Sequence, residues 1–538
     1  MEKNEGASYN PVEFSWKQFW ESLFYENFPP GIFSPLIALL IERSLSRAWY
    51  VCQNRGICPM STKYNSLGFI ISCWLFFFPG SWLLTSALFI SLFSQANVIT
   101  NIDISLVIIA FICLFMRRII VSVKYGYFSP EIYHKLSKPA PEWDGDKTRR
   151  QLVTWGWSKP RDYPGLLEDE LTISMNNNDV SLRDISFTLN LSTAEFFQKK
   201  ENNSRFAATT EFTEKNQVSA AFLLTEILKS VYEKNPLLKS NESSMNIMTF
   251  SFALILPAIA LYFSYSYGLE FFGSSVASKF VGVGTLIGLF LCHQLLLFGL
   301  LCRFDYNRRS SALKILGDLI QYPGVKKSHI YPDDLELIEM KENIFIDLEN
   351  RSNVFSWTVT RRVLKTFGEA FYERIQGYTS ILFLFSLICV GILNLLFWGA
   401  FEHHISTIIV LICIICSIAF VSLRAISSAI KLQNLSEMHK DRLRRIIFML
   451  EEQSANSNSE TNIANKENSS SVRALLQQAD ESLGYYELVY KPVMLLGYPA
   501  SRRLIGSFLG IFFTGLVLAL EGFSGSGISY DTHGWFLR

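Results

Sequence analysis

A polar stripe follows one side of the last apolar segment of the chain. Ser507, Thr514 and Glu521 lie seven residues apart, and Gly510 falls on the same line. On an α-helix this spacing places all four residues on one side, with about 20° of drift per step. Repeated around a symmetric oligomer, the hydroxyls would replace water around a passing ion, and the Glu521 carboxylates would attract cations. The stripe therefore predicts a pore wall.

The same segment allows a second interpretation. Gly506, Gly510 and Gly515 are small residues of the kind that let two membrane helices approach closely. From the stripe alone, pore lining and helix packing both remain open. Arg502 and Arg503 directly precede the segment, and under the pore interpretation they lie at its cytosolic exit.

Other polar residues inside apolar segments are scarce. Ionisable groups within membrane helices usually mark ion or proton pathways. Only His293, followed by Gln294, lies near the middle of such a segment. Coupled transporters generally need buried carboxylates, so this scarcity disfavours a transporter, and we interpret His293 as a hydrogen-bonded packing residue.

Metal, redox and enzymatic sites are not indicated. Cys413 and Cys416 form a C-x-x-C motif within an apolar segment, where packing is expected. His403 and His404, beside Glu402, occupy a short turn, where solvated side chains are the simpler interpretation. Zincin, nucleophile-elbow and phosphate-loop motifs are not found. We expect no enzymatic activity, no bound metal and no cofactor.

Seven segments of the chain are long and apolar enough to cross a bilayer core of about 30 Å. They span residues 67–93, 104–120, 247–265, 280–301, 381–398, 406–421 and 504–520. Only 18% of the residues are charged and the net charge is +1. A nucleic-acid-binding protein would show a basic excess, so that class is excluded.

The distribution of basic residues predicts the orientation. The short connections and the C-terminal tail contain only Lys279 and Arg538 as basic residues, whereas arginines flank the other ends of the segments. By the positive-inside rule, the N-terminus and the three long loops are cytosolic. The tail after the last segment is then outside.

These patterns predict an all-α polytopic membrane protein with seven transmembrane helices, long cytosolic helical extensions and a small mixed α/β first cytosolic loop. The N-terminal region, which carries amphipathic interfacial helices, and the first loop are residues 1–65 and 124–245. The remaining cytosolic regions are residues 304–379 and 425–503, the latter with a flexible linker at 454–471. Transmembrane regions are residues 66–123, 246–303, 380–424 and 504–521, and the external tail is residues 522–538.

Within the cytosolic regions, apolar and polar side chains alternate over residues 185–191, which predicts a strand. Over residues 218–232 the apolar side chains recur at the spacing of one helix face, which predicts a helix. A helix is expected at residues 309–320, and another from residue 332 with little interruption into the fifth segment. The sixth segment has no helix breaker before residue 452. Such long helices require packing partners beyond the membrane. Residues 472–490 predict a further helix just before the last segment.

The last segment resembles the final helix of the insect odorant and gustatory receptor superfamily and its relatives in protists and plants. The signature of that helix is Thr-Tyr, five apolar residues, then Gln-Phe. This chain keeps Thr514 and the spacing, with Gly515 for Tyr, Glu521 for Gln and Gly522 for Phe. The resemblance covers about twenty residues and the topology. It implies four subunits that meet through cytosolic helices, with the last helix of each lining a central cation pore.

Together, these features predict a homo-oligomeric, tetrameric cation channel in which ligand gating is one option. Its partners would be the lipid bilayer, cations and further copies of the chain, and the plasma membrane is the favoured location. A non-conducting membrane scaffold is the main alternative. A small-molecule transporter that uses the surroundings of His293 is a weaker one.

Overall fold

The computed structural model describes a set of segments, and every structural statement below refers to them. They are residues 14–17, 19–20, 104–127, 172–175, 178–189, 216–233, 236–266, 276–320, 346–366, 369–398, 403–456, 463–485, 493–525 and 536–537. The first predicted membrane segment, at residues 67–93, lies outside them, as do most of the N-terminal region and the tail.

Most of the described residues are helical. The helices are α6 (Ile104–Tyr127), α10 (Ala220–Glu233), α11 (Pro236–Ser266), α12 (Val276–Leu291), α13 (His293–Asp318), α15 (Arg351–Thr366), α16 (Glu369–Phe397), α17 (Ile405–Asn456), α18 (Ile463–Leu483) and α19 (Arg502–Gly525). The strands are β1 (Thr172–Met175), β2 (Asn178–Ser181), β3 (Ser186–Thr188), β4 (Gln217–Ser219), β5 (His403–His404), β6 (Met494–Leu495), β7 (Tyr498–Pro499) and β8 (Phe536–Leu537). Each strand pairs with one other, as β1–β2, β3–β4, β5–β8 and β6–β7.

In the described part of the chain, five helices are long and apolar enough to cross a membrane. They correspond to α11, to α12 continued by α13, to α16, to α17 and to α19, and so coincide with the third to seventh predicted segments. The second predicted segment falls in α6, whose apolar stretch Ser105–Arg117 is shorter. The chain is therefore a mainly helical integral membrane protein.

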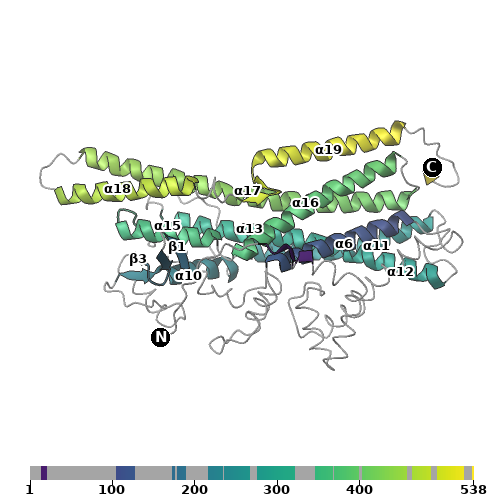
Figure 1. The fold of residues 1–538 in the computed structure, drawn as a ribbon, viewed down its shortest axis with the longest axis horizontal. Coiled ribbons are helices and arrows are strands. Elements are labelled where there is room, and N and C mark those ends of the chain that lie inside the picture. The colour runs from purple at the N-terminus through teal and green to yellow at the C-terminus, as the bar shows by residue number, and fades with distance from the viewer. Residues whose placement is uncertain are drawn as a thin grey trace, which may run out of the picture.

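The helices run roughly along one long axis (Figure 1). The 52-residue α17 would be about 78 Å long at 1.5 Å per residue, more than twice the thickness of a bilayer core. Its predicted continuation to residue 452 is confirmed. We call the bundle formed by α15, α18, residues 303–318 of α13 and residues 425–456 of α17 the stem. It occupies the left half of Figure 1, opposite α19.

A small set of strands and α10 docks on the stem. Asn353 of α15 joins the two, because its side-chain amide donates to the Thr188 carbonyl at 3.0 Å and its Oδ1 accepts from the Thr188 amide at 2.8 Å. Ser356, one turn later, donates to the Ser186 carbonyl at 2.6 Å. The polar side chains of one helix thus complete the hydrogen bonding of the β3 backbone.

Several element boundaries differ from the sequence-based expectation. The helix predicted at residues 309–320 is the continuation of α13, and the fourth segment is divided at Cys292 instead. Separate helices, α15 and α16, replace the single helix expected between residue 332 and the fifth segment. The helix α18 begins at Ile463, inside the segment predicted as a linker, and β3 is shorter than the predicted strand.

Candidate functional site

The last helix, α19, carries the predicted pore-lining residues and follows a tight hairpin. Strands β6 and β7 are joined by Leu496 and Gly497, which have φ angles of 52° and 78°. Two consecutive positive φ values belong to a type I′ turn, whose twist matches paired strands. The helix then starts after Ser501, a residue type favoured at N-caps.

The hairpin is fixed to the two neighbouring long helices. The Val493 amide donates to Gln433 Oε1 of α17 at 3.0 Å, and the Met494 amide donates to Gln376 Oε1 of α16 at 2.6 Å. A third bond, from the Leu496 amide to Ser380 Oγ of α16, is 2.9 Å long. These bonds satisfy hairpin donors and fix the point at which α19 begins.

Along its length, α19 packs mainly on α16. Phe508, the largest fully buried side chain of α19, lies with its ring centroid 4.5 Å from that of Phe383. Near the outer half, Gly515 permits a close approach, since a Cβ there would lie 2.5 Å from Val390 Cγ1. Two polar side chains, one from α16 and one from the residue directly after it, also reach the α19 backbone. The Asn394 amide donates to the Gly515 carbonyl at 2.9 Å, and Trp398 Nε1 donates to the Leu518 carbonyl at 3.1 Å.

The four stripe residues are all exposed on the opposite side of α19. At about 100° per residue, Ser507, Gly510, Thr514 and Glu521 fall within an arc of about 60°. The buried Phe508 lies about 100° or more from every one of them. A Cβ added to Gly510 would meet nothing within 4 Å. Ser507, Gly510 and Thr514 therefore face away from the side of α19 that packs on α16.

Exposed apolar side chains border this stripe on both sides. Ile511 and Leu518 lie on one side of it, and Phe513 and Leu520 on the other. The exposed face of α19 is thus a polar centre line between two apolar margins.

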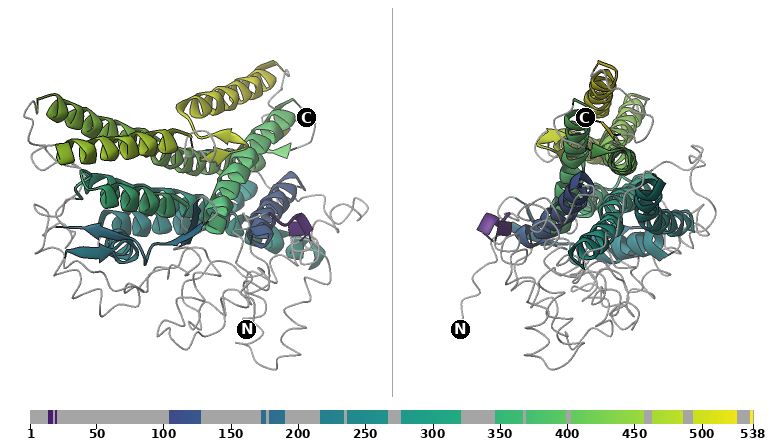
Figure 2. Two further views of the ribbon diagram at one scale, coloured as in Figure 1. Left: turned by 60° about the vertical axis from the view of Figure 1, so that its left-hand side comes forward. Right: turned by 90° about the vertical axis from the view of Figure 1, so that its right-hand side faces the viewer.

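This helix is the least buried of the five candidate spans. Only 11% of its apolar window is buried inside the chain, against 62% for the span formed by α12 and α13 and 61% for α17. Seen along the long axis, α19 lies at the edge of the bundle (Figure 2, right). Most of its surface is left for lipid or for another molecule.

Charged residues lie at the two ends of α19. Arg502 and Arg503 are exposed at its start, and Glu521 is exposed near its end. From Arg503 to Glu521 the helix rises by about 27 Å, close to the thickness of a bilayer core. The charges are therefore spaced to lie at the two membrane surfaces.

His293 occupies a break in the fourth span. The Cys292 amide donates to both the Gly288 and Leu289 carbonyls, at 3.2 and 3.1 Å, so the helix tightens locally between α12 and α13. His293 is half-buried, and its Nδ1 lies 2.5 Å from the Phe290 carbonyl. The side chain of Gln294 lies outside the described residues. These contacts agree with the interpretation of His293 as a hydrogen-bonded packing residue.

The remaining candidate ligands do not come together. Across the segments that the structure describes, no three His, Cys, Asp or Glu side chains are placed to hold a metal ion. His403 and His404 form β5 and pair with Leu537 and Phe536 of β8, while Glu402 lies outside the described residues. Cys413 and Cys416 are both free thiols on α17.

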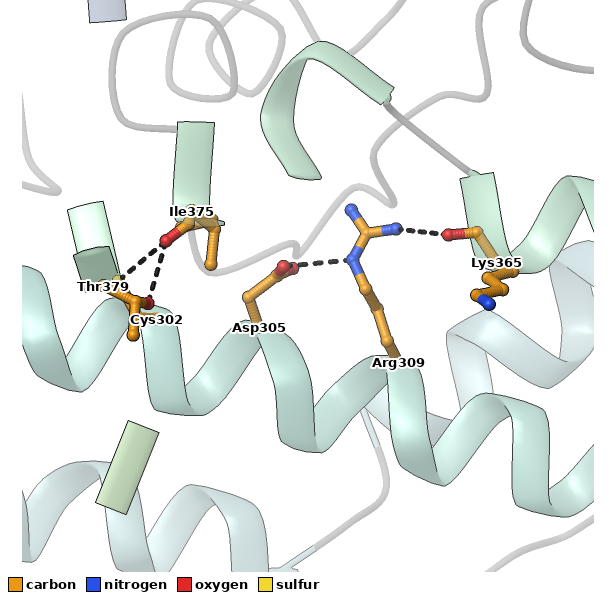
Figure 3. A network of polar contacts seen from close by, with 6 residues as sticks. All are labelled: Cys302, Asp305, Arg309, Lys365, Ile375 and Thr379. Atoms are coloured by element: carbon orange, nitrogen blue, oxygen red, sulfur yellow. Dashed lines mark hydrogen bonds and ion pairs between the residues drawn. The ribbon is translucent and has the colours of Figure 1, made fainter. Parts of the chain in front are cut away.

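A buried polar network in and beside the stem was not anticipated from the sequence. Arg309 Nε donates to Asp305 Oδ2 at 3.0 Å, and Arg309 Nη1 donates to the Lys365 carbonyl of α15 at 3.5 Å (Figure 3). One turn before Asp305, the Cys302 thiol donates to the Ile375 carbonyl of α16 at 3.6 Å. The four-residue spacing of Asp305 and Arg309 is a helical ion-pair pattern that could have indicated this pair.

A second polar contact joins three stem helices. Arg361 of α15, fully buried, donates from Nε to His439 Nδ1 of α17 at 2.7 Å and from Nη2 to Ser436 Oγ at 3.2 Å. Trp357 packs edge-on against the His439 ring and donates to the Leu316 carbonyl of α13 at 3.1 Å. Burial lowers the pKa of Arg361 to about 9. The stem thus encloses polar side chains and forms hydrogen bonds to several of their atoms.

A scan against protein-family models, a search of curated proteins and a search of solved structures each found no match. The fold and its apolar helices define the class as helical integral membrane proteins.

Proposed function

We propose that this chain is a subunit of a homo-oligomeric cation channel, with α19 of each subunit lining a shared pore. The observation that carries the proposal is the position of the polar stripe. It runs along the centre of the exposed face of α19, which the rest of the chain does little to cover. In this arrangement Ser507, Gly510 and Thr514 face the ion path, and Glu521 forms a ring at the outer mouth. Arg502 and Arg503 line the cytosolic exit.

The physical argument compares lipid with another subunit as the neighbour of this face. A carboxylate or hydroxyl is costly in hydrocarbon, and an ionisable group in a span normally faces protein or water. Helical Ser and Thr can reduce the cost by bonding their own backbone, but Glu521 and Gly510 on the same line gain nothing from lipid. When the α19 helices of several subunits surround a symmetry axis, the polar stripe faces the water of the pore and the apolar margins contact neighbouring subunits.

The resemblance of residues 504–521 to the final helix of the insect odorant and gustatory receptors supports the same arrangement. That resemblance implies a tetramer whose cytosolic helices meet and whose last helix lines the pore. The long stem helices of this chain, and α18 before α19, are compatible with such an assembly. Under the proposal the chain has seven spans, a cytosolic N-terminus and an external tail.

The test combines particle symmetry with conductance. Purified protein should form symmetric oligomers with α19 around the axis and should conduct cations in planar bilayers. The variant Glu521→Gln should lower the ratio of cation to anion permeability, because it removes the charge ring at the mouth. The control Glu437→Gln changes an exposed acid of the stem and should leave the ratio unchanged. Strictly monomeric, non-conducting particles would disprove the channel.

A non-conducting scaffold is the competing function. It is favoured by the large apolar side chains exposed on and beside the stem, since Phe355, Phe448 and Tyr485 are 43%, 65% and 66% exposed. In that case α19 would stay singly associated with its own α16, and bilayers would show no current. The same purified sample thus distinguishes the two functions.

A transporter is the third function, and the polar residue inside the fourth span favours it. Ionisable residues within spans mark substrate and proton pathways in many transporters, and His293 lies at the local tightening between α12 and α13. Saturable uptake without single-channel currents, lost in His293→Ala, would support this function over the channel.

A further inference from the structure

We propose that Asn394 of α16 and Trp398, the residue directly after α16, are positioning residues that set the rotation of α19 about its own axis. The inference rests on the proposed channel function, because the rotation decides which side chains face the pore. The evidence lies in the contacts between α16 and the outer half of α19.

Two side-chain donors at the end of α16 and directly after it reach two carbonyls of α19. The Asn394 amide donates to the Gly515 carbonyl and, within its own helix, to the Val390 carbonyl, both at 2.9 Å. Trp398 Nε1 donates to the Leu518 carbonyl at 3.1 Å. A helical carbonyl has a second lone pair, so both can accept these donors while keeping their helical bonds. Residues three apart lie on one side of a helix, so the two bonds act on the same side.

These bonds constrain rotation because hydrogen bonds depend steeply on distance and direction. With helix atoms about 2.3 Å from the axis, a rotation by one residue would move each carbonyl by about 3.5 Å. Both bonds would then be lost. The same rotation would place Phe513 or Gly515 where Thr514 now points.

Gly515 makes this attachment possible. A Cβ at this position would lie 2.5 Å from Val390 Cγ1 and 3.8 Å from Asn394 Nδ2, so only glycine lets the α19 backbone come this close to α16. Thr514, directly before it, is held on the far side. The residue that departs from the Thr-Tyr signature is therefore the residue that brings α19 within reach of Asn394.

The Asn394 amide is a costly choice for a packing residue. Its Oδ1 is buried and has no hydrogen-bond partner among the described residues. A leucine of similar size would bury no unsatisfied acceptor, so Asn394→Leu should fold. This variant can therefore test the positioning role without loss of the protein.

The experiment measures which residues of α19 face water in the conducting protein. Cysteine is introduced at the stripe by Thr514→Cys and at the apolar margin by Phe513→Cys, each in the full-length chain. A membrane-impermeant cationic thiol reagent is applied while current is recorded. The chain without an added cysteine supplies the baseline, because Cys416 is itself exposed on α17.

In the otherwise unchanged chain, the reagent should modify the cysteine of Thr514→Cys and block the current, and it should leave the cysteine of Phe513→Cys unmodified. Adding Asn394→Leu should reduce the modification rate at position 514 and raise it at 513, each roughly two- to tenfold, the range expected for loss of one net hydrogen bond. Trp398→Phe removes the indole donor but keeps an aromatic ring, and should shift the rates in the same direction. Leu395→Ala, at an exposed apolar site of α16, is the matched control.

Two results would overturn the inference, and only the second would also overturn the location of the pore on α19. In the first, the reagent blocks the current of Thr514→Cys, but the modification rates at positions 513 and 514 stay the same when Asn394→Leu or Trp398→Phe is added. The positioning role is then wrong and the channel stands. If neither cysteine reacts in the otherwise unchanged chain, the pore location on α19 is wrong, and the positioning role fails with it.

Discussion

The stem and α19 use polar residues in opposite ways. In the stem, Arg361 and His439 are completely buried and bonded to one another across two helices. On α19, Ser507 and Thr514 are exposed and point away from the chain. The stem thus encloses polar groups and bonds several of their atoms within the chain, whereas the polar face of α19 is left for a neighbour.

This difference separates two roles that look alike in the sequence. Polar residues occur on the helices of both regions, and their spacing in the sequence does not show which of them are enclosed. Burial distinguishes them, because a group that is enclosed and bonded stabilises one arrangement of the fold. We therefore expect substitutions in the stem to change stability, and substitutions on the stripe to change conduction with little effect on stability.

The largest expected effect is the loss of the buried pair in Figure 3. Asp305→Ala leaves Arg309, 7% exposed, without its closest anion. Removing one partner of a buried ion pair typically costs about 3–5 kcal/mol. Thermal unfolding of the purified protein in detergent should show a large fall in melting temperature.

The exposed pair of Arg473 and Glu451 supplies the control. Their side chains are 45% and 39% exposed, and such surface pairs contribute about 0–1 kcal/mol. Glu451→Ala should therefore leave the melting temperature nearly unchanged. Equal shifts for Asp305→Ala and Glu451→Ala would contradict the contrast between a bonded interior and an exposed surface.

The sequence was sufficient for the long helices and for the stripe. The run from Ile405 to Asn456 lacks proline and glycine, so its helix could be predicted nearly to its end. The seven-residue spacing of Ser507, Thr514 and Glu521 likewise places them on one face of a helix without any tertiary information. Local rules are enough where the relevant residues lie on one element.

Contacts between elements could not be predicted in this way. Arg361 and His439 are 78 positions apart, and Asn394 and Gly515 are 121 apart. No local pattern indicates that one reaches the other. The local tightening at Cys292 was also missed, because no proline marks it. Such features depend on how the helices pack.

A further prediction concerns Lys365, a lysine enclosed in the stem. Burial, and secondarily the charge of Arg361, lowers its pKa from 10.5 to about 6. Between these two values the unfolded chain binds a proton that the folded protein does not, so stability rises with pH. It falls as the pH is lowered through this window. Lys365→Met should raise the melting temperature near neutral pH and flatten this part of the profile.

The measurement is the melting temperature in detergent at pH values near the two ends of the window. Lys431→Met, at an exposed position of α17, is the control and should keep the original slope. A Lys365→Met variant with an unchanged slope would show that this lysine is not enclosed as the structure has it.

The smallest stability effects come from two glycines that differ only in what surrounds them. In the stem, a Cβ at Gly317 would collide with the His439 ring, so Gly317→Ala should cost about 1–3 kcal/mol through overpacking. On α19, a Cβ at Gly510 would meet nothing within 4 Å. Since alanine is favoured over glycine in a helix by about 1 kcal/mol, Gly510→Ala should be neutral or slightly stabilising in thermal unfolding.

Conductance makes this glycine pair informative about the oligomer. If Gly510 lines a shared pore, the added methyl groups form a ring around the ion path, and unitary current should fall while the melting temperature does not. Gly317→Ala should do the reverse, lowering the melting temperature and leaving the unitary current of the folded protein unchanged. A fall in melting temperature for Gly510→Ala, of the size seen for Gly317→Ala, would mean that a close packing partner covers this face. That outcome would favour helix packing over a water-filled pore, and so would decide between the two interpretations that the polar stripe leaves open.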